Sequence, residues 1–332
     1  MSLCVLAPLR ETFRVAAVLS VAFATGVAHA DEAAVATVLK SLHRPCGVAV
    51  RPGGTADRYE VFLAESGSGR VVRWSSHTPN RAADMVTGFA SQAAADPFHQ
   101  TGPVSLWFLD PGLLVVGTTQ NADGDLVRAY ELPDGESALS AEVARESTKN
   151  ENKLDGATCS AIGRSRANEY VPDTLALVVR GTDGRTRLLK ARVQAGILGD
   201  PHPFGPADSA SSPRAVATSD SGRIVVADAG GRLTFYNPIN GTVELAMPID
   251  LKEVTGLAYS PTSDSLYAVD FAGGIHRIDD ASQPGRPACK TVKVADVDQP
   301  TALAFAPDGA LYVVTYGDGD DNGTLQVITG DL

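Results

Sequence analysis

The sequence lacks the common signatures of enzymes. It contains no G-x-S-x-G nucleophile elbow, no H-E-x-x-H zinc motif, no Walker phosphate loop and no G-x-G-x-x-G after a strand. Cysteine is scarce as well, because the chain has only four, with no C-x-x-C spacing that would indicate zinc binding or redox work. The sequence therefore indicates no particular chemistry directly, and it is more informative about architecture.

Basic residues are fewer than acidic ones. The chain carries 28 Lys and Arg against 39 Asp and Glu, which gives a formal net charge of −11. A chain of this charge does not attract nucleic acids or anionic membranes. We therefore expect neither of them as a partner.

Only the N-terminus carries a long apolar run. Two arginines precede the run 15–27, and the triplet Ala28-His29-Ala30 fits the small-x-small rule of signal peptidase. The run is too short for a good membrane span, and Cys4 lies on the wrong side of it for a lipoprotein anchor. We expect a signal peptide over 1–30 with cleavage after Ala30, and a secreted or periplasmic single domain over 31–332.

The rest of the chain consists of one unit repeated six times. In the clearest copy, an apolar run, a turn, an alternating run closed by an aspartate, a glycine turn and a third alternating run follow one another. The copies begin about 40 to 60 residues apart, which is the period of a four-stranded propeller blade. They span 45–74, 102–132, 158–193, 212–247, 254–294 and 300–328.

This pattern predicts an all-β fold, a single six-bladed β-propeller of four-stranded antiparallel blades. The outer strands of the first two blades are expected near 84–89 and 140–146. A seven-bladed propeller is the alternative, with the extra blade within 88–101 or 194–212. Both stretches are rich in Pro, Asp and Ala, which is typical of loops.

The two ends of the chain indicate how the ring closes. The sixth copy reaches the C-terminus after only three strands, while the segment 34–40, AVATVLK, precedes the first copy with no other place in the pattern. We predict that this segment pairs as the outer strand of the last blade. Such pairing would remove two exposed sheet edges at once.

Cleavage of the signal peptide would leave three cysteines: Cys46, Cys159 and Cys289. An odd number in an oxidising compartment leaves at least one free thiol. Cys46 and Cys159 fall at matching positions of the first and third copies, so we expect them to lie apart around the ring, and a disulfide is the less favoured alternative.

The copies resemble a known group of propellers. The inner-strand sequences PCGVAV, SPRAVA, TGLAYSP and PTALAFAPDG, and the hairpins FLAESGSGRVVRW, VVADAGGRLTFY and YAVDFAGGIHRID, are similar to the NHL and gluconolactonase-like (senescence marker protein) six-bladed propellers. The similarity covers nearly all of 45–328 as a repeat-level pattern. The chain also resembles exported bacterial propeller proteins without an assigned activity.

This resemblance implies a metal site that the chain does not retain. The lactonases of the group hold a divalent metal in the central channel with a Glu, an Asn and an Asp. The matching positions here are Cys46 (or Pro45), Thr255 and Thr301. Threonine hydroxyls are poor ligands for a hard cation, so we do not expect metal-dependent lactonase activity.

The ends of the second strands carry the first set of candidate site residues. A propeller places them near one face, where converging charged groups could bind a small polar ligand and an arginine could orient an anion. The alternative is structural, because an aspartate after a strand commonly accepts hydrogen bonds from the following turn. The set consists of Glu65, Thr118, Arg180, Asp228, Asp270 and Tyr316.

Two long loops carry the second set. The sequences DPFHQTG (96–102) and DPHPFGP (200–206) place His99 and His202 where binding specificity often lies. The Pro and Phe residues beside them indicate an alternative, a hydrophobic plug that holds each loop down.

One short motif suggests calcium. Asp318, Asp320 and Asn322 alternate before a glycine as in D-x-[DN]-x-[DN]-G, which supplies oxygen ligands and a turn. The glutamate that completes an EF-hand loop is replaced by Thr329, so a solvated acidic turn is the competing interpretation.

Together these observations favour an exported, non-catalytic binding or interaction module, expected to be a monomer, with a protein or small polar ligand as partner and calcium as the one cofactor considered. The alternative is a hydrolase or isomerase of the lactonase-like class that uses the channel mouth.

Overall fold

The computed structural model describes residues 33–53, 58–92, 94, 97–119, 125–149, 157–165, 172–181, 183–206, 212–279, 289–330 and 332. The expected signal peptide and its cleavage site lie outside these residues. Apart from two 3₁₀ turns, η1 (Ser66–Ser68) and η2 (Pro97–His99), the regular elements are strands. No helix in the described part of the chain is long and apolar enough to span a membrane.

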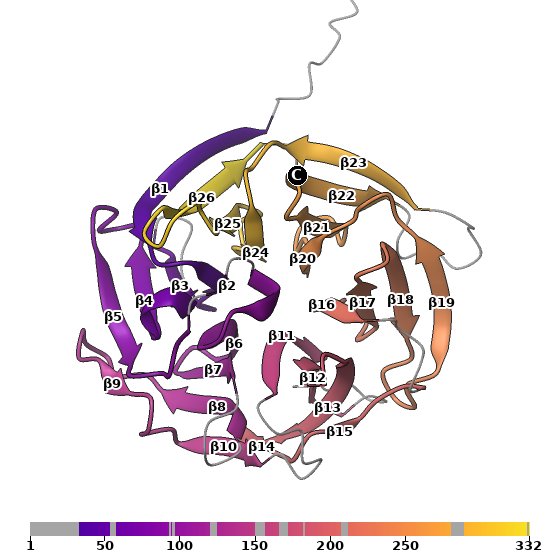
Figure 1. Ribbon diagram of the computed structural model, residues 1–332, viewed down its shortest axis with the longest axis horizontal. Helices are drawn as coiled ribbons and strands as arrows, with labels where there is room; N and C mark the ends of the chain where they lie inside the picture. The colour runs from indigo at the N-terminus through magenta and orange to yellow at the C-terminus, as the bar shows by residue number, and fades with distance from the viewer. Residues whose placement is uncertain are drawn as a thin grey trace, which may run out of the picture. The chain divides into compact units, whose positions relative to one another are not determined.

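The strands form six sheets, antiparallel apart from one short parallel pairing at the outer edge of blade 1, arranged as the blades of a ring (Figure 1), which confirms the six-bladed propeller. From inside to outside, blade 1 contains β2 (Pro45–Val50), β3 (Glu60–Glu65), β4 (Arg70–Ser75) and β5 (Ala82–Thr87). Blade 2 contains β6 (Pro103–Asp110), β7 (Leu113–Thr118), β8 (Asp125–Glu131) and β10 (Glu146–Lys149). Blade 3 contains β11 (Thr158–Ser165), β12 (Thr174–Arg180), β13 (Thr186–Gln194), β14 (Ile197–Leu198) and β15 (His202–Pro203).

The second half of the ring is more regular. Blade 4 contains β16 (Pro213–Thr218), β17 (Ile224–Asp228), β18 (Arg232–Tyr236) and β19 (Val243–Pro248). Blade 5 contains β20 (Val254–Tyr259), β21 (Leu266–Asp270), β22 (Gly274–Asp279) and β23 (Lys290–Ala295). Blade 6 contains β24 (Pro300–Phe305), β25 (Leu311–Thr315), β26 (Gly323–Thr329) and, as its outer strand, β1 (Ala34–Leu42).

The core lies between the blades. Six clusters of buried apolar side chains each join two neighbouring blades. Phe62 of blade 1, for example, meets Phe108 of blade 2 edge to face at 5.0 Å between ring centroids. Second strands such as β21 and β25 are buried at every position. A strand covered on both faces must be apolar nearly throughout, which explains the short continuous apolar runs of the sequence.

The ring closes as predicted. β1 pairs antiparallel with β26, with Ala34 opposite Thr329 and Thr37 opposite Gln326. Strands from the two ends of the chain therefore complete one blade.

The expectations for two segments outside the inner three strands of the blades need correction. The outer strand of blade 2 was expected at 140–146, but it is β10. The segment before it forms β9 (Leu139–Ser140), which runs parallel to β5 of blade 1. The reason is that the carbonyl of Ala141 accepts hydrogen bonds from Arg128 and Tyr130 at 2.7 Å, which ties this segment down before β10 begins. The stretch 194–212 was expected to be a loop, but its described residues include the short strands β14 and β15, which join blade 3 and do not form a separate sheet.

Candidate functional site

The six inner strands share one irregularity. Each contains a β-bulge near its start, where the register with the second strand shifts by one residue. A bulged residue has no partner across the ladder, and its side chain is redirected. The six bulged residues are Cys46, Val104, Ser160, Arg214, Thr255 and Thr301.

All six bulged residues line a single cavity of about 180 Å³, which we name the rim cavity. Because one residue comes from each blade, the rim cavity lies on the central channel, at the end where the inner strands begin. The turn η2 and the hairpin that joins β12 to β13 contribute further lining residues, namely Phe98, His99, Gln100, Arg180, Gly184 and Thr186.

The charged side chains among the described lining residues of the rim cavity are basic. Arg180 and Arg214 line it, as does His99, and the described lining contains no aspartate or glutamate. Thr186 also lines the cavity, and its buried hydroxyl oxygen has no hydrogen-bond partner among the described residues. The arrangement suits a polar ligand that accepts hydrogen bonds.

A row of aromatic and cationic side chains holds η2 at this end of the channel. The guanidinium of Arg214 stacks on Phe98 with its central carbon 3.7 Å from the ring centroid. Phe98 contacts Phe271 edge to face at 6.4 Å, and Phe271 contacts Tyr316 at 6.1 Å. The Tyr316 hydroxyl is 2.7 Å from the side-chain oxygen of the buried Gln100. The packing of Phe98 matches the plug interpretation of this loop.

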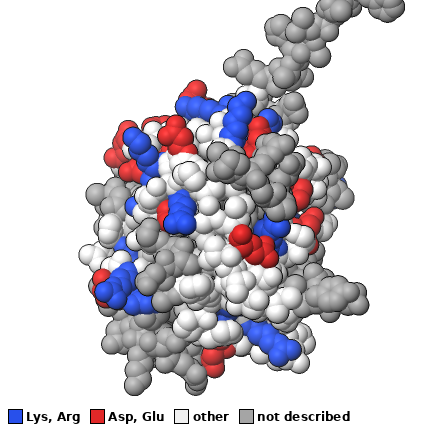
Figure 2. All heavy atoms as spheres, turned by 90° about the vertical axis from the view of Figure 1, so that its right-hand side faces the viewer, with Lys and Arg blue, Asp and Glu red and all other residues white. Residues whose placement is uncertain are grey.

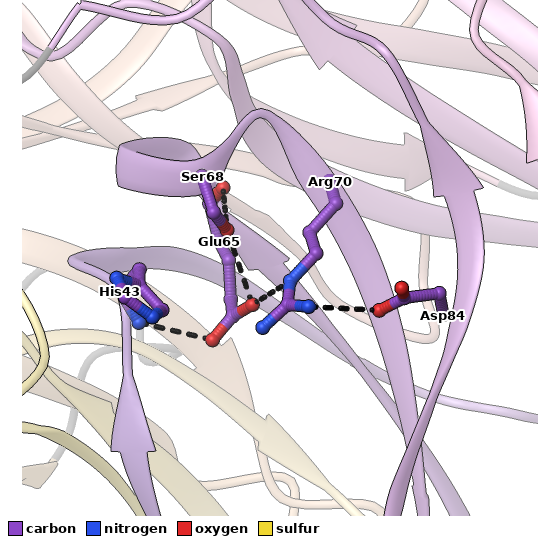
Figure 3. Close-up of polar contacts among 5 residues, drawn as sticks. All are labelled: His43, Glu65, Ser68, Arg70 and Asp84. Carbon is purple, nitrogen blue, oxygen red and sulfur yellow. Dashed lines mark hydrogen bonds and ion pairs between the residues drawn. The ribbon is translucent and has the colours of Figure 1, made fainter.

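Of the six strand-end candidates, Arg180 lines the rim cavity. Glu65 is fully buried, is not among the lining residues, and makes structural contacts (Figure 3). Its carboxylate accepts hydrogen bonds from the backbone N–H of His43 at 2.9 Å and from the hydroxyl of Ser68 at 3.2 Å. It also forms an ion pair with Arg70, which contacts Asp84 in turn.

The two aspartates of this set accept hydrogen bonds from backbone N–H groups. Asp228 accepts from Gly230 at 2.9 Å and Arg232 at 3.1 Å. Asp270 accepts from Glu253 at 3.0 Å and from Ala272 at 3.2 Å. These contacts are those of the turn-capping alternative.

Two further members of the set lie beside the cavity. Thr118 donates a hydrogen bond to the carbonyl of Thr119 at 2.9 Å, and the buried Tyr316 takes part in the aromatic row. A direct ligand contact by either residue stays a prediction.

The two histidines of the loop candidates are not brought together. His99 is exposed and lines the rim cavity, whereas His202 lies exposed on β15, which pairs with β13 in blade 3. Their proposed roles in binding stay predictions, but the two side chains do not share this site.

The positions that correspond to the lactonase metal ligands are three of the six bulges. Thr255 donates to the carbonyl of Pro300 at 2.8 Å, and Thr301 donates to that of Pro45 at 2.7 Å, so each hydroxyl bonds the next blade. Burial raises the pKa of the Cys46 thiol to about 12, which disfavours the thiolate that would bind a metal. This donor set does not fit a hard divalent cation.

The acidic loop after β25 has its carboxylates engaged with different partners. Asp320 forms an ion pair with Arg44 at 2.8 Å, and Asp318 accepts a hydrogen bond from Gln299 at 3.0 Å. No group of three His, Cys, Asp or Glu side chains suited to a metal is found within the described ranges. Calcium binding by Asp318, Asp320 and Asn322 stays a prediction.

The sequence interpretation missed Arg214, Ser160 and Thr186. A signal for the first was present, because Arg214 follows Pro213 in SPRAVA as Cys46 follows Pro45 in PCGVAV. Thr158 pairs with Arg180 as Pro45 pairs with Glu65, so Cys159 follows the start of its strand as Cys46 does, but the bulge of blade 3 lies one residue later, at Ser160. Cys159 is a buried free thiol in a different blade from Cys46, so the two cysteines lie apart as expected.

No family model matches the chain, and no curated protein matches its sequence. Solved structures share its fold. A glucose dehydrogenase aligns with a TM-score of 0.62 and 14% identity, over 90% of this chain and 100% of its own. The PQQ-bound aldose sugar dehydrogenase of Streptomyces coelicolor aligns at 0.58 and 12%, over 90% and 99%. A candidate gluconolactonase aligns at 0.58 and 14%, over 90% and 92%.

These likenesses define a class of fold, the six-bladed propellers of the gluconolactonase and glucose dehydrogenase type, and so confirm the resemblance noted in the repeats. Identities of 12 to 14% establish the fold alone.

Proposed function

We propose that the protein is an enzyme that hydrolyses or isomerises a small, sugar-derived molecule bound in the rim cavity. The observation that carries the proposal is the ring of six bulges, which directs one side chain from every blade at a single cavity. The comparisons add support, because the solved structures that share the fold are named as sugar dehydrogenases and a candidate gluconolactonase. They favour this function over a purely non-catalytic module.

Three side chains of the rim cavity have roles in this proposal. Arg180 and Arg214 orient the polar groups of the substrate through their planar sets of N–H donors. His99 lies at the exposed edge of the cavity and has the side-chain type best suited to move a proton at neutral pH. No step uses a metal ion, because Cys46, Thr255 and Thr301 do not fit one.

A second candidate function is a binding module for a protein or a small polar ligand at the same face. The observation that favours it is the aromatic row, because Phe98 and Tyr316 hold η2 at the channel mouth by packing and hydrogen bonding. Export to the periplasm or the medium belongs to both proposals and rests on the N-terminal sequence, and the monomeric state stays a prediction.

Turnover of sugar lactones and sugar isomers by the purified chain tests the proposal. We expect His99→Ala to lower kcat by roughly 10²- to 10⁴-fold, the usual contribution of a general acid or base. His77→Ala is the matched control, because His77 is exposed in a turn of blade 1 away from the cavity lining. Absence of turnover in wild type, or equal rates for wild type and His99→Ala, would support the binding module instead.

A further inference from the structure

The rim cavity differs in charge from the rest of the molecule. The chain as a whole carries −11, and on the face drawn in Figure 2 acidic and basic side chains are interspersed. The described lining of the cavity, in contrast, contains two arginines and one histidine and no acidic group. The charged side chains among the described lining residues are thus opposite in sign to the net charge of the chain, which favours an anionic ligand at this site.

We propose that the rim cavity selects a small hydroxylated carboxylate, such as a sugar acid, over neutral and cationic molecules of the same size. The inference names the charge class of the substrate, and it rests on the proposed function only in taking the rim cavity as the ligand site.

Arg214 is held for this role by its place on the bulge of β16. The bulge directs its side chain into the cavity, and stacking on Phe98 at 3.7 Å fixes the plane of the guanidinium. Stacking uses the face of the guanidinium, whereas its N–H groups point outward in the plane. An arginine oriented in this way has little rotamer freedom left to lose when it binds a carboxylate.

Arg180 lies on the neighbouring blade between two hydroxyl-bearing residues. It ends β12 and is paired with Thr158 on one side and with Thr186 on the other, and all three residues line the cavity. The buried hydroxyl of Thr186, which lacks a partner among the described residues, can donate to a ligand oxygen. Blades 3 and 4 thus contribute both arginines and four hydroxyl-bearing residues, counting Ser160 and Ser212.

The size of the cavity limits the ligand. A volume of about 180 Å³ is below the roughly 300 to 1,000 Å³ of pockets for drug-sized molecules. A short polyhydroxylated molecule with one carboxylate matches this volume. Its carboxylate suits the two guanidinium groups, and its hydroxyl groups suit the hydroxyls of the lining.

A series of ligands that share one sugar frame and differ in charge tests the proposal. Gluconate, glucose, glucosamine and glucose 6-phosphate would be titrated into the wild-type protein by calorimetry in 0.15 M salt. At this ionic strength the repulsion of anions by distant acidic groups is screened beyond about 8 Å. We expect gluconate to bind at least tenfold more tightly than glucose, and glucosamine to bind most weakly.

Substitutions then assign the charge preference to the two arginines. Arg180→Gln and Arg214→Gln should each weaken gluconate binding by about 10- to 100-fold, the value of a lost hydrogen bond to a charged group, and should leave glucose binding within about threefold. Arg232→Gln is the control, because Arg232 is exposed on β18 and does not line the cavity. Melting temperatures would confirm that each variant is folded.

The outcomes separate this inference from the proposed function. Equal affinities for gluconate and glucose, tighter binding of glucosamine, or no binding of any member would overturn the selection of carboxylates. Tighter binding of glucose 6-phosphate than of gluconate would overturn the carboxylate and identify a phosphate site. Gluconate binding without turnover of any sugar derivative would support the selection of carboxylates and overturn the proposed catalysis. Turnover of neutral lactones without preference for an anion would support the proposed catalysis and overturn the selection of carboxylates.

Discussion

At the scale of single residues, Glu65 shows how a candidate for chemistry can serve structure. Its carboxylate is fully buried and bonds the backbone of the segment before β2, the turn after β3 and Arg70 of β4. A buried carboxylate requires partners of this kind, because an unpaired one would cost several kcal/mol. These contacts connect three segments of blade 1.

We therefore expect Glu65→Gln to lower the free energy of unfolding by about 1 to 3 kcal/mol, since a charged acceptor is replaced by a weaker neutral one. Glu60→Gln is the matched control, because Glu60 is about one quarter exposed in its ion pairs with Arg51 and Arg73, and such pairs are worth about 0 to 1 kcal/mol. Urea denaturation of the two variants measures the difference. Equal losses would show that the buried contacts of Glu65 are not important for stability.

The thiols of Cys46, a half-buried residue, and Cys159, a buried one, predict a fall in stability at alkaline pH. Burial raises the pKa of both Cys46 and Cys159 to about 12 from an ordinary value of 9.0. Above pH 9 the unfolded chain therefore loses these protons while the folded chain keeps them, so the free energy of unfolding is retained below pH 9 and declines towards pH 12. Unfolding measured at pH 8, 9.5 and 10.5 should show a shallower decline in Cys46→Ala/Cys159→Ala than in wild type. Parallel curves would contradict this assignment.

Part of the site could be predicted from single residues and part could not. Cys46, Thr255 and Thr301 were named only as the positions that match the lactonase metal ligands. Arg214 and Ser160 were missed, because the alternation of apolar residues does not reveal a bulge, the local loss of pairing that places all five of these residues at the cavity.

At the scale of elements, β1 is the strand whose role was clearest from the sequence. A blade with three strands leaves an unpaired edge, and a spare strand near the N-terminus can fill it. The outer strand of blade 2 was placed wrongly for a related reason. Outer strands are mostly exposed, so their burial pattern identifies them poorly, and here the hydrogen bonds to Ala141 decide where the chain joins the sheet.

Locking β1 to β26 should stabilise the whole propeller. Thr37→Cys/Gln326→Cys places two cysteines on directly opposed residues, and a disulfide there closes nearly the whole chain into a loop. We expect the oxidised form to exceed the reduced form by about 2 to 4 kcal/mol in free energy of unfolding. Removal of 33–40 should destabilise the ring and cause aggregation through the exposed edge. If the oxidised and reduced forms are equally stable and the truncated chain is unaffected, closure by β1 contributes nothing.

At the scale of the whole molecule, the number of blades followed from the period of the repeats, but the chemistry of the channel did not. The rim cavity gathers residues from Cys46 to Thr301, and its character depends on which six side chains the bulges bring together. The row from Arg214 through Phe98 and Phe271 to Tyr316 connects segments separated by more than 200 positions. A sequence pattern of neighbouring residues cannot predict contacts between segments that are so far apart in the chain.

The closure of the ring also has a mechanical consequence. Ala34, at the start of β1, lies opposite Thr329, at the end of β26, so the two ends of the chain leave blade 6 at the same end of one strand pair (Figure 1). A force that pulls these ends apart loads the first hydrogen bonds alone, and they break in succession as in unzipping, instead of sharing the load as in shear. Blade 6 would open first under tension, while the other five blades, none of which combines strands from the two ends of the chain, would bear little of the load.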